Sequence, residues 1–241
     1  MDSREIMLWF DLDDTIWDMS GNSVICLKEL YESQGLDRWF DSHVEWDEVY
    51  HRVNRELWAQ YGRGDITREF LRSERFARPL RIGGVPEADA EEMAASFDTL
   101  YLDSLGRKTA LIDGARETLD YLQSRGYRMG IVSNGFREVQ YNKLRSSAID
   151  GYFDPVVLSD DAGVNKPHRR FFDYAVERAG SQAMRNIIRN IIIGDNLSAD
   201  IAGAVDAGWG AIWFNPGGDA PCDGLTGYEC VADLRELKRR F

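Results

Sequence analysis

The chain has 241 residues, of which 44% are hydrophobic and 29% are charged, and its formal net charge at pH 7 is −12. This composition is typical of a globular chain, and the length fits one large domain or a domain that carries an insert. The negative charge argues against nucleic acid polymers and anionic membranes as partners, whereas a small anionic metabolite needs only a local cationic pocket.

The sequence favours a cytoplasmic protein, either a monomer or a homodimer. Its three cysteines, Cys26, Cys222 and Cys230, are odd in number and form no CxxC pair, which argues against a disulfide framework. The first residues lack the basic segment and the long apolar stretch of a signal peptide. No run approaches the ~18–20 apolar residues that a transmembrane helix needs.

Five short apolar runs predict the strands of a parallel sheet, because strands buried on both faces read as unbroken apolar segments. The runs span residues 6–10, 127–133, 156–159, 190–194 and 210–215. Helical patterns at 115–126, 137–148, 168–180 and 198–208 alternate with the later runs. Ser198 is the predicted N-cap of the last helix. This alternation predicts an α/β, doubly wound parallel sheet with helices on both faces.

The segment between the first strand and the remaining strands has no comparable apolar run. It is predicted to be helical instead, at residues 23–35, 46–62, 67–80 and 87–105. The predicted domains are therefore an α/β core of residues 1–16 and 109–241, and an all-helical insert of residues 17–108.

Polar residues follow the predicted strands. Asp11 and Asp13 end the first strand, Ser133 begins an "SNG" turn after the second, and Asp195 follows the strand at 190–194. Ligands of open α/β sheets bind beyond the carboxyl ends of the strands, where we expect these side chains and that of Lys166 to meet. Residues i and i+2 of extended backbone project to one side, so Asp11 and Asp13 are predicted to face one pocket.

This set of residues suits phosphate ester chemistry. Two close carboxylates need a shared proton or a cation, and with Asp195 they form the hard oxygen set that Mg²⁺ prefers. Lys166 adds a positive charge for an anionic group, and Ser133 adds a donor. An ionised carboxylate can attack phosphorus while a second one protonates the leaving oxygen, so Asp11 and Asp13 divide into nucleophile and acid/base.

The motifs resemble those of the haloacid dehalogenase-like phosphatases: "DLDDT" (11–15), "SNG" (133–135), "KP" (166–167) and "GDNLSAD" (194–200) stand in that family's order. The resemblance implies a Rossmann-like core, with the insert as a helical cap that closes over the substrate. It implies Asp11 as nucleophile, and Asp13 as acid/base with its backbone carbonyl on Mg²⁺. It implies phosphate-binding positions at Thr15, Ser133, Asn134 and Lys166, with Thr15 bracing the loop, and metal-binding positions at Asp11, Asp13, Asp195 and Asp200.

A narrower resemblance concerns the substrate. Residues 53–76 are similar to the cap of the bacterial pyrimidine 5′-nucleotidases, and residues 135–180 resemble the core of that subgroup. It implies a nucleoside monophosphate as substrate. A sugar phosphate or phosphoglycolate phosphatase and a phosphoglucomutase-type transferase stay open as alternatives. A 2-haloacid dehalogenase is disfavoured by the acid at Asp13, and a phospho-accepting signalling module is about half this length and lacks the insert.

Several side chains leave two roles open. Aromatic residues of the insert could stack on a base or form a core; they are Trp17, Trp46, Trp58, Tyr61 and Phe76. Arg75 and Arg78 could be surface charges or could reach the substrate. Asp14 and Asp18 are interpreted as solvated or turn-forming residues.

Overall fold

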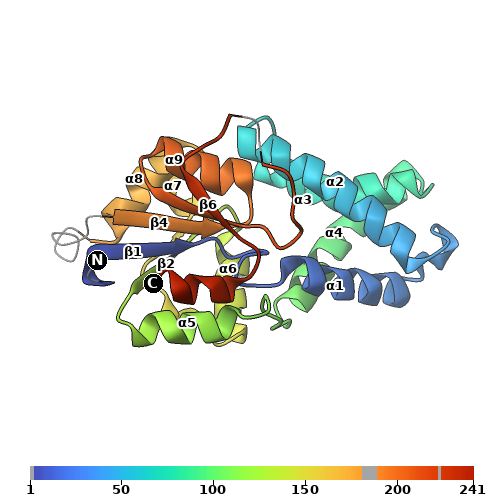
Figure 1. Cartoon of the computed structure of the whole chain (residues 1–241). Coiled ribbons are helices and arrows are strands. Elements are labelled where there is room, and N and C mark those ends of the chain that lie inside the picture. The colour runs from blue at the N-terminus through green and yellow to red at the C-terminus, as the bar shows by residue number, and fades with distance from the viewer. Residues whose placement is uncertain (1–2, 181–188, 222–223) are drawn as a thin grey trace. The chain divides into compact units, whose positions relative to one another are not determined.

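The computed structural model describes residues 3–180, 189–221 and 224–241. The chain forms two compact units, one of Met1–Met19 with Thr109–Phe241 and one of Ser20–Lys108. The first unit contains a parallel sheet with helices, and the second is helical (Figure 1). This confirms the predicted fold class.

The sheet has six parallel strands in the order β3-β2-β1-β4-β5-β6. The strands are β1 Ile6–Phe10, β2 Arg128–Ser133, β3 Val156–Leu158, β4 Arg189–Gly194, β5 Gly210–Phe214 and β6 Tyr228–Val231. All five predicted strands are present, whereas β6 was not predicted. Because β6 lies at the sheet edge and is mostly solvent-accessible, its sequence lacks the unbroken apolar run of an inner strand.

Helices cover both faces of this sheet. They are α5 Ala115–Ser124, α6 Arg137–Ser146, α7 Ser159–Ala162, α8 Arg169–Arg178 and α9 Gly203–Asp206. The helices α8 and α9 lie on the opposite face from α5 (Figure 1). On the α8 face, Trp9 of β1 stacks on Trp209 with ring centroids 5.5 Å apart, and Phe172 of α8 meets Trp209 edge-on. Alternate residues of β1 thus fill the core on this face.

The helix predicted at 198–208 differs from its prediction in how it begins. A π-helical segment, Leu197–Ala202, precedes α9, and Asn196 is its N-cap. The Asn196 Oδ1 atom accepts hydrogen bonds from the backbone N–H groups of Ser198 and Ala199, at 3.1 and 2.9 Å. The prediction of Ser198 as the cap is therefore wrong, because the amide oxygen of Asn196 already satisfies those first N–H groups.

The second unit packs its helices around an aromatic core. Its helices are α1 Met19–Gln34, α2 His43–Arg63, α3 Arg68–Ile82 and α4 Glu87–Leu105. Ser42 and Thr67 cap α2 and α3 by accepting backbone hydrogen bonds. The core consists of the buried rings of Trp46, Tyr50, Phe76, Phe97 and Tyr101. Trp46 and Phe76 are thus core residues, which decides between the two roles left open for them.

The other side chains of this unit for which the sequence allowed two roles differ in how deeply they are buried. Arg75 is 4% exposed and donates to Asp98 from Nε at 2.7 Å, so it is an internal ion-pair partner. Arg78 lies 3.5 Å from Glu74. Trp58 and Tyr61 stay partly exposed, with their rings edge to face at 5.6 Å.

A buried tryptophan anchors the chain after β1. Trp17 is fully buried in the first unit, and its Nε1 donates to Ser147 Oγ at 2.9 Å. The preceding turn holds Asp14 at a φ of 55°, a left-handed conformation that Asp tolerates better than most residues. The returning segment pairs with this one, since the Ile112 N–H donates to the Ile16 carbonyl at 3.0 Å.

Two further predictions concern cysteines and membranes. Cys26 is a buried free thiol and Cys230 an exposed one, whereas Cys222 lies outside the described residues. None of the described helices combines the length and the apolar character needed to cross a membrane.

Candidate active site

The site lies where the carboxyl ends of three neighbouring strands meet. Asp11 directly follows β1, Ser133 ends β2, and Asp195 directly follows β4. The Asp11 N–H donates to the Ile193 carbonyl at 2.9 Å, which continues the β1–β4 pairing by one residue. Because β1 lies between β2 and β4, the strand order reverses here, and such a point in an α/β sheet is a ligand-binding position.

Lys166 places a buried ammonium group among these strand ends. Its Nζ donates to Asp11 Oδ1 at 2.7 Å, to Asp200 Oδ1 at 2.6 Å and to the Val132 carbonyl at 2.7 Å. Burial alone would lower the pKa of Lys166, but the charges of Asp11 and Asp200 outweigh it and raise that pKa above its ordinary value. The lysine is therefore a permanent cation in this site.

Asp11, Asp195 and Asp200 form a carboxylate cluster, with one oxygen of each within 4.8 Å of the others. Burial is the largest cause that raises the pKa of Asp11 to about 7, with Lys166 opposing it and Asp200 adding to it. Burial likewise raises the pKa of Asp195 to about 8, and the charges of Asp11 and Asp200 add to that shift. When all three are ionised, Lys166 leaves two negative charges uncompensated. The donor set and its charge therefore fit a hard divalent cation.

Neighbouring groups hold two of these carboxylates in place. Thr15 is fully buried; its Oγ1 donates to Asp195 Oδ1 at 3.2 Å and accepts from the Asp195 N–H at 3.0 Å. The Asn196 N–H donates to Asp200 Oδ2 at 3.1 Å. Gly194 permits this arrangement, because a Cβ atom there would lie 2.5 Å from Asp200 Oδ2. These contacts of Thr15 favour the bracing role over direct contact with phosphate.

Asn134 uses both ends of its amide on the lysine backbone. Its Nδ2 donates to the Lys166 carbonyl at 3.0 Å, and its Oδ1 accepts from the Lys166 N–H at 2.8 Å. This pair of bonds fixes the segment that carries the ammonium group. A phosphate-binding role for the Asn134 side chain stays a prediction, and the contacts present are those of a clamp on Lys166.

Ser133 is oriented so that its hydroxyl proton can be donated. Its Oγ accepts from the Gly135 N–H at 3.1 Å and from Gln140 Nε2 at 2.7 Å. A hydroxyl has two lone pairs and one proton, so with both lone pairs engaged its remaining capacity is donation. A donor at this strand end suits an anionic oxygen.

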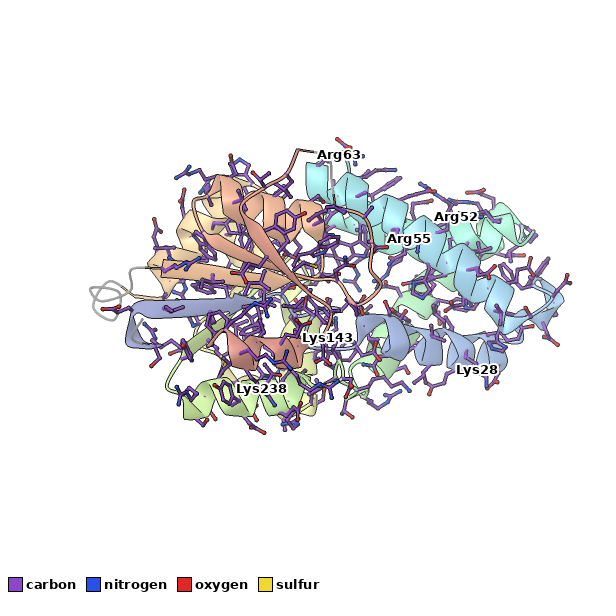
Figure 2. All side chains as sticks on the ribbon, in the orientation of Figure 1. Lys28, Arg52, Arg55, Arg63, Lys143 and Lys238 are labelled. Carbon is purple, nitrogen blue, oxygen red and sulfur yellow. The ribbon has the colours of Figure 1, made fainter. Side chains whose placement is uncertain are left out.

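Asp13 faces two residues that the sequence analysis did not identify. Lys143 Nζ donates to Asp13 Oδ1 at 2.6 Å, and Gln140 Nε2 donates to Asp13 Oδ2 at 3.0 Å. Both partners come from α6, and Figure 2 labels Lys143. The Asp13 carboxylate thus points to α6 and lies outside the carboxylate cluster, so any metal contact of this residue is left to its backbone carbonyl.

A sequence signal for these two residues exists. Gln140, Lys143 and Leu144 share the buried face of α6, because residues three and four apart lie on one side of a helix. An amide and an ammonium group on an inward face need buried partners. That pattern in the helix after the "SNG" turn would have pointed to a carboxylate partner.

Comparisons with known proteins identify the family of the chain. A family model for haloacid dehalogenase-like hydrolases matches residues 8–214. A protein named HAD-hydrolase YfnB from Bacillus subtilis is 34% identical over 209 residues, which span 87% of this chain and 83% of YfnB. A crystal structure of YfnB bound to magnesium has a TM-score of 0.84 and 32% identity, and the match covers 98% of each chain.

Two further relatives carry names that specify a substrate. The pyrimidine 5′-nucleotidase YjjG of Escherichia coli is 27% identical over 96% of each chain. The glyceraldehyde 3-phosphate phosphatase of Methanothermobacter thermautotrophicus is 31% identical over 86% of this chain and 84% of its own. The family model matches most of this chain, and the family's motifs lie together at the carboxyl ends of the strands. The chain therefore belongs to the haloacid dehalogenase-like hydrolases.

Proposed function

We propose that the chain hydrolyses a small phosphate monoester in two steps, through an aspartyl phosphate formed on Asp11. The observation that carries the proposal is the buried ion pair of Asp11 and Lys166 at the carboxyl end of β1, beside Asp195 and Asp200. The reaction class is that of the nucleotidase and phosphatase relatives.

In the first step, a carboxylate oxygen of Asp11 attacks phosphorus and the bond from phosphorus to the ester oxygen breaks. The electron pair of that bond goes to the leaving oxygen, which takes a proton from the Asp13 carboxyl and departs as an alcohol. Lys166 and the Ser133 hydroxyl supply donors to the phosphoryl oxygens, where negative charge accumulates. Lys166 also holds the nucleophile, since it already bonds one oxygen of Asp11.

In the second step, water attacks the phosphorus of the aspartyl phosphate. The Asp13 carboxylate takes a proton from that water, and the bond from phosphorus to the Asp11 oxygen breaks. Inorganic phosphate leaves, Asp11 is again a carboxylate, and Asp13 is again protonated. One ester and one water have become one alcohol and one phosphate, so the chain ends in its starting state.

The carboxylates of Asp11, Asp195 and Asp200 would hold Mg²⁺, together with the backbone carbonyl of Asp13. Bound there, the ion supplies positive charge that screens the repulsion between a carboxylate nucleophile and a phosphate dianion. The two uncompensated negative charges of the carboxylate cluster support a divalent ion.

A pyrimidine nucleoside monophosphate is the substrate that we propose. The match to YjjG over 96% of each chain supports it, as do the partly exposed rings of Trp58 and Tyr61, because aromatic side chains stack on bases. Residues 17–108 would act as the cap that closes over the substrate. A sugar phosphate is the second candidate, favoured by the similarity to a glyceraldehyde 3-phosphate phosphatase. A cytoplasmic location and a monomeric or dimeric state stay predictions.

A phosphate-release panel with Mg²⁺ present tests this proposal. It compares pyrimidine and purine nucleoside monophosphates, sugar phosphates, phosphoglycolate and a haloacid. Highest kcat/KM for the pyrimidine nucleotides is expected, and a preference for sugar phosphates would move the proposal to the second candidate. Asp11→Asn should abolish release while its thermal unfolding stays cooperative; near-normal release by that variant would overturn the mechanism.

A further inference from the structure

Lys143 is a buried cation whose role the reaction described above does not include. It is 2% exposed, its Nζ lies 4.8 Å from the centroid of the Trp17 ring, and it bonds the Asp13 carboxylate at 2.6 Å. We propose that Lys143 and Gln140 are positioning residues, which hold the Asp13 carboxyl for proton transfer to the leaving group. This inference rests on the proposed phosphatase reaction.

The contacts restrict how Asp13 can move. Lys143 bonds Oδ1 and Gln140 bonds Oδ2, so rotation of the carboxyl group would break one bond or both. The side chain of Asp13 is 30% exposed, whereas that of Lys143 is 2% exposed, so a carboxyl accessible to ligand is held by a partner that is not. Each carboxyl oxygen keeps a further lone pair, so a proton can still reside on Asp13.

The surroundings of Lys143 hold its ammonium group in turn. The Trp17 ring lies beneath it, Met19 Sδ accepts from Nζ at 3.5 Å, and Trp17 is itself fixed by its bond to Ser147. A cation over an aromatic face in a desolvated site is stabilised by the ring. These contacts therefore hold the Lys143 ammonium group beside the Asp13 carboxyl group.

Gln140 connects the acid/base residue with the phosphate-binding serine. Its Nε2 donates both to Asp13 Oδ2 and to Ser133 Oγ, at 3.0 and 2.7 Å, and the side chain is fully buried. One amide nitrogen thus sets the spacing between the group that moves the proton and a donor aimed at the phosphoryl oxygens. Such fixed spacing places the Asp13 carboxyl beside the bond that breaks.

The benefit of Lys143 arises as the proton moves. When Asp13 gives its proton to the leaving oxygen, a carboxylate forms, and the hydrogen bond from the ammonium group becomes an ion pair in which both partners are charged. The bond strengthens in the transition state, so it accelerates the step. A leaving group that departs easily as an anion does not need that proton. The contribution of Lys143 should therefore depend on the leaving group.

The test uses the full-length protein with Mg²⁺ present and compares two phosphate esters as substrates. One is p-nitrophenyl phosphate, whose leaving group is a stable anion, and the other is the alkyl phosphate that the substrate panel ranks first. The readout is kcat/KM, which covers steps up to alcohol release and excludes hydrolysis of the aspartyl phosphate. Lys143→Met keeps the packing on Trp17 and should lower kcat/KM about 10- to 100-fold for the alkyl ester. The loss for the nitrophenyl ester should stay below about threefold.

Matched variants separate positioning from general damage. Arg145→Met removes an exposed cation from the same helix and should leave both esters unchanged. Lys143→Gln is the second variant, with the same comparison, should the Met variant unfold. In the Asp13→Asn background, Lys143→Met should cause little further loss at the alkyl ester, because residues that act as one unit are not additive.

Each outcome decides between the two proposals. A loss confined to the alkyl ester supports the positioning role. Parallel losses for both esters, or an alkyl ester hydrolysed at the wild-type rate, would overturn it while the phosphatase proposal stands. Absence of phosphate release by the wild-type protein, or release by Asp11→Asn, would instead overturn the phosphatase proposal itself.

Discussion

Binding of Mg²⁺ to the metal-free protein is expected to strengthen steeply between about pH 5.5 and about pH 8. The ion would bind Asp11 and Asp195 as carboxylates, yet burial gives them pKa values of about 7 and about 8, against 3.8 for an unperturbed Asp. Below these values each group holds a proton that Mg²⁺ must displace. Proton release on binding is therefore the direct consequence of the crowded carboxylates.

The size of the effect follows from the two pKa values. A carboxyl with a pKa of about 8 is ionised in about half of the molecules at about pH 8, but in only about 0.3% at about pH 5.5. One with a pKa of about 7 falls from about 90% to about 3% ionised over the same range. Displacing the first proton alone should change the Kd by about 10²-fold, and displacing both should change it several thousandfold, on the order of 10³ to 10⁴.

The folded state shows the same linkage without the metal. Because both pKa values are raised above the unfolded value of 3.8, the folded protein binds protons more tightly than the unfolded chain. These two groups should thus stabilise the metal-free protein most below about pH 4, and their contribution should be lost as pH rises through about 7 to 8. Mg²⁺ should raise the unfolding temperature most at the alkaline end, where the carboxylates repel one another.

Isothermal titration in buffers of different ionisation enthalpy measures both the Kd and the number of protons released. Wild-type protein should release between one and two protons near about pH 6, and Asp195→Asn should release fewer. A Kd that stays within about threefold across the range, with no proton release, would show that Asp11 and Asp195 are already ionised before Mg²⁺ binds.

Three further predictions concern stability, each measured by urea unfolding. Lys166→Met leaves the carboxylate cluster without its buried cation and should destabilise the metal-free protein by about 3 kcal/mol at alkaline pH, less in acid, where protons replace the charge. Gly194→Ala places a Cβ atom 2.5 Å from Asp200 Oδ2 and should cost about 1–3 kcal/mol and weaken Mg²⁺ binding. Arg75→Met leaves the buried Asp98 with one arginine partner fewer and should cost about 3 kcal/mol.

Controls for these variants come from positions that are partly or fully exposed. Lys238→Met removes a cation that pairs at 3.3 Å with the half-exposed Glu117, and should change stability by less than about 1 kcal/mol. Gly151→Ala adds a Cβ atom with nothing within 4 Å. Arg78→Met loosens only a long surface pair and should be nearly neutral. Equal losses in a variant and its control would show that the close contacts named above do not determine stability.

The strands and the strand-end motifs could be predicted because their signals are local. An apolar run such as residues 6–10 must be buried, and a parallel sheet brings the polar residues that follow its strands to the same end of the sheet. This is why Asp11, Lys166 and Asp195 could be grouped from the sequence alone. Strand β6 carries no such signal, since an edge strand that is half exposed resembles a loop in composition.

The sequence could not predict which side chains bond to one another, because that depends on how helices and strands pack and on where their side chains point. Lys143 lies 130 positions from Asp13, and only the packing of α6 on the loop after β1 brings them together. Asn134 shows the same difficulty: its amide could bond a ligand or a backbone, and its two bonds to the Lys166 backbone depend on packing that the sequence does not reveal. Trp46 and Phe76 show it for the aromatic residues, whose core positions depend on α2 and α3 packing.

The central position of β1 also bears on how this chain is made. Ile6–Phe10 leaves the ribosome before the other strands of the sheet, yet its neighbours are β2 and β4, and Leu8 pairs with Met129 and Ile191. A fully apolar nascent segment must therefore wait while more than a hundred further residues are translated. Pairings of such long range slow folding and expose strand edges to aggregation.

Because of this order, a chain that ends before β4 lacks both a complete sheet and a complete site. The helical unit, Ser20–Lys108, is complete before any partner of β1 exists, and β4 is the element that encloses the last free edge of β1. The residue that follows β4 is Asp195 of the carboxylate cluster. Nascent chains that stall or are cleaved before this strand lack both a closed core and a complete reaction centre, so fragments that persist in the cell would be inert.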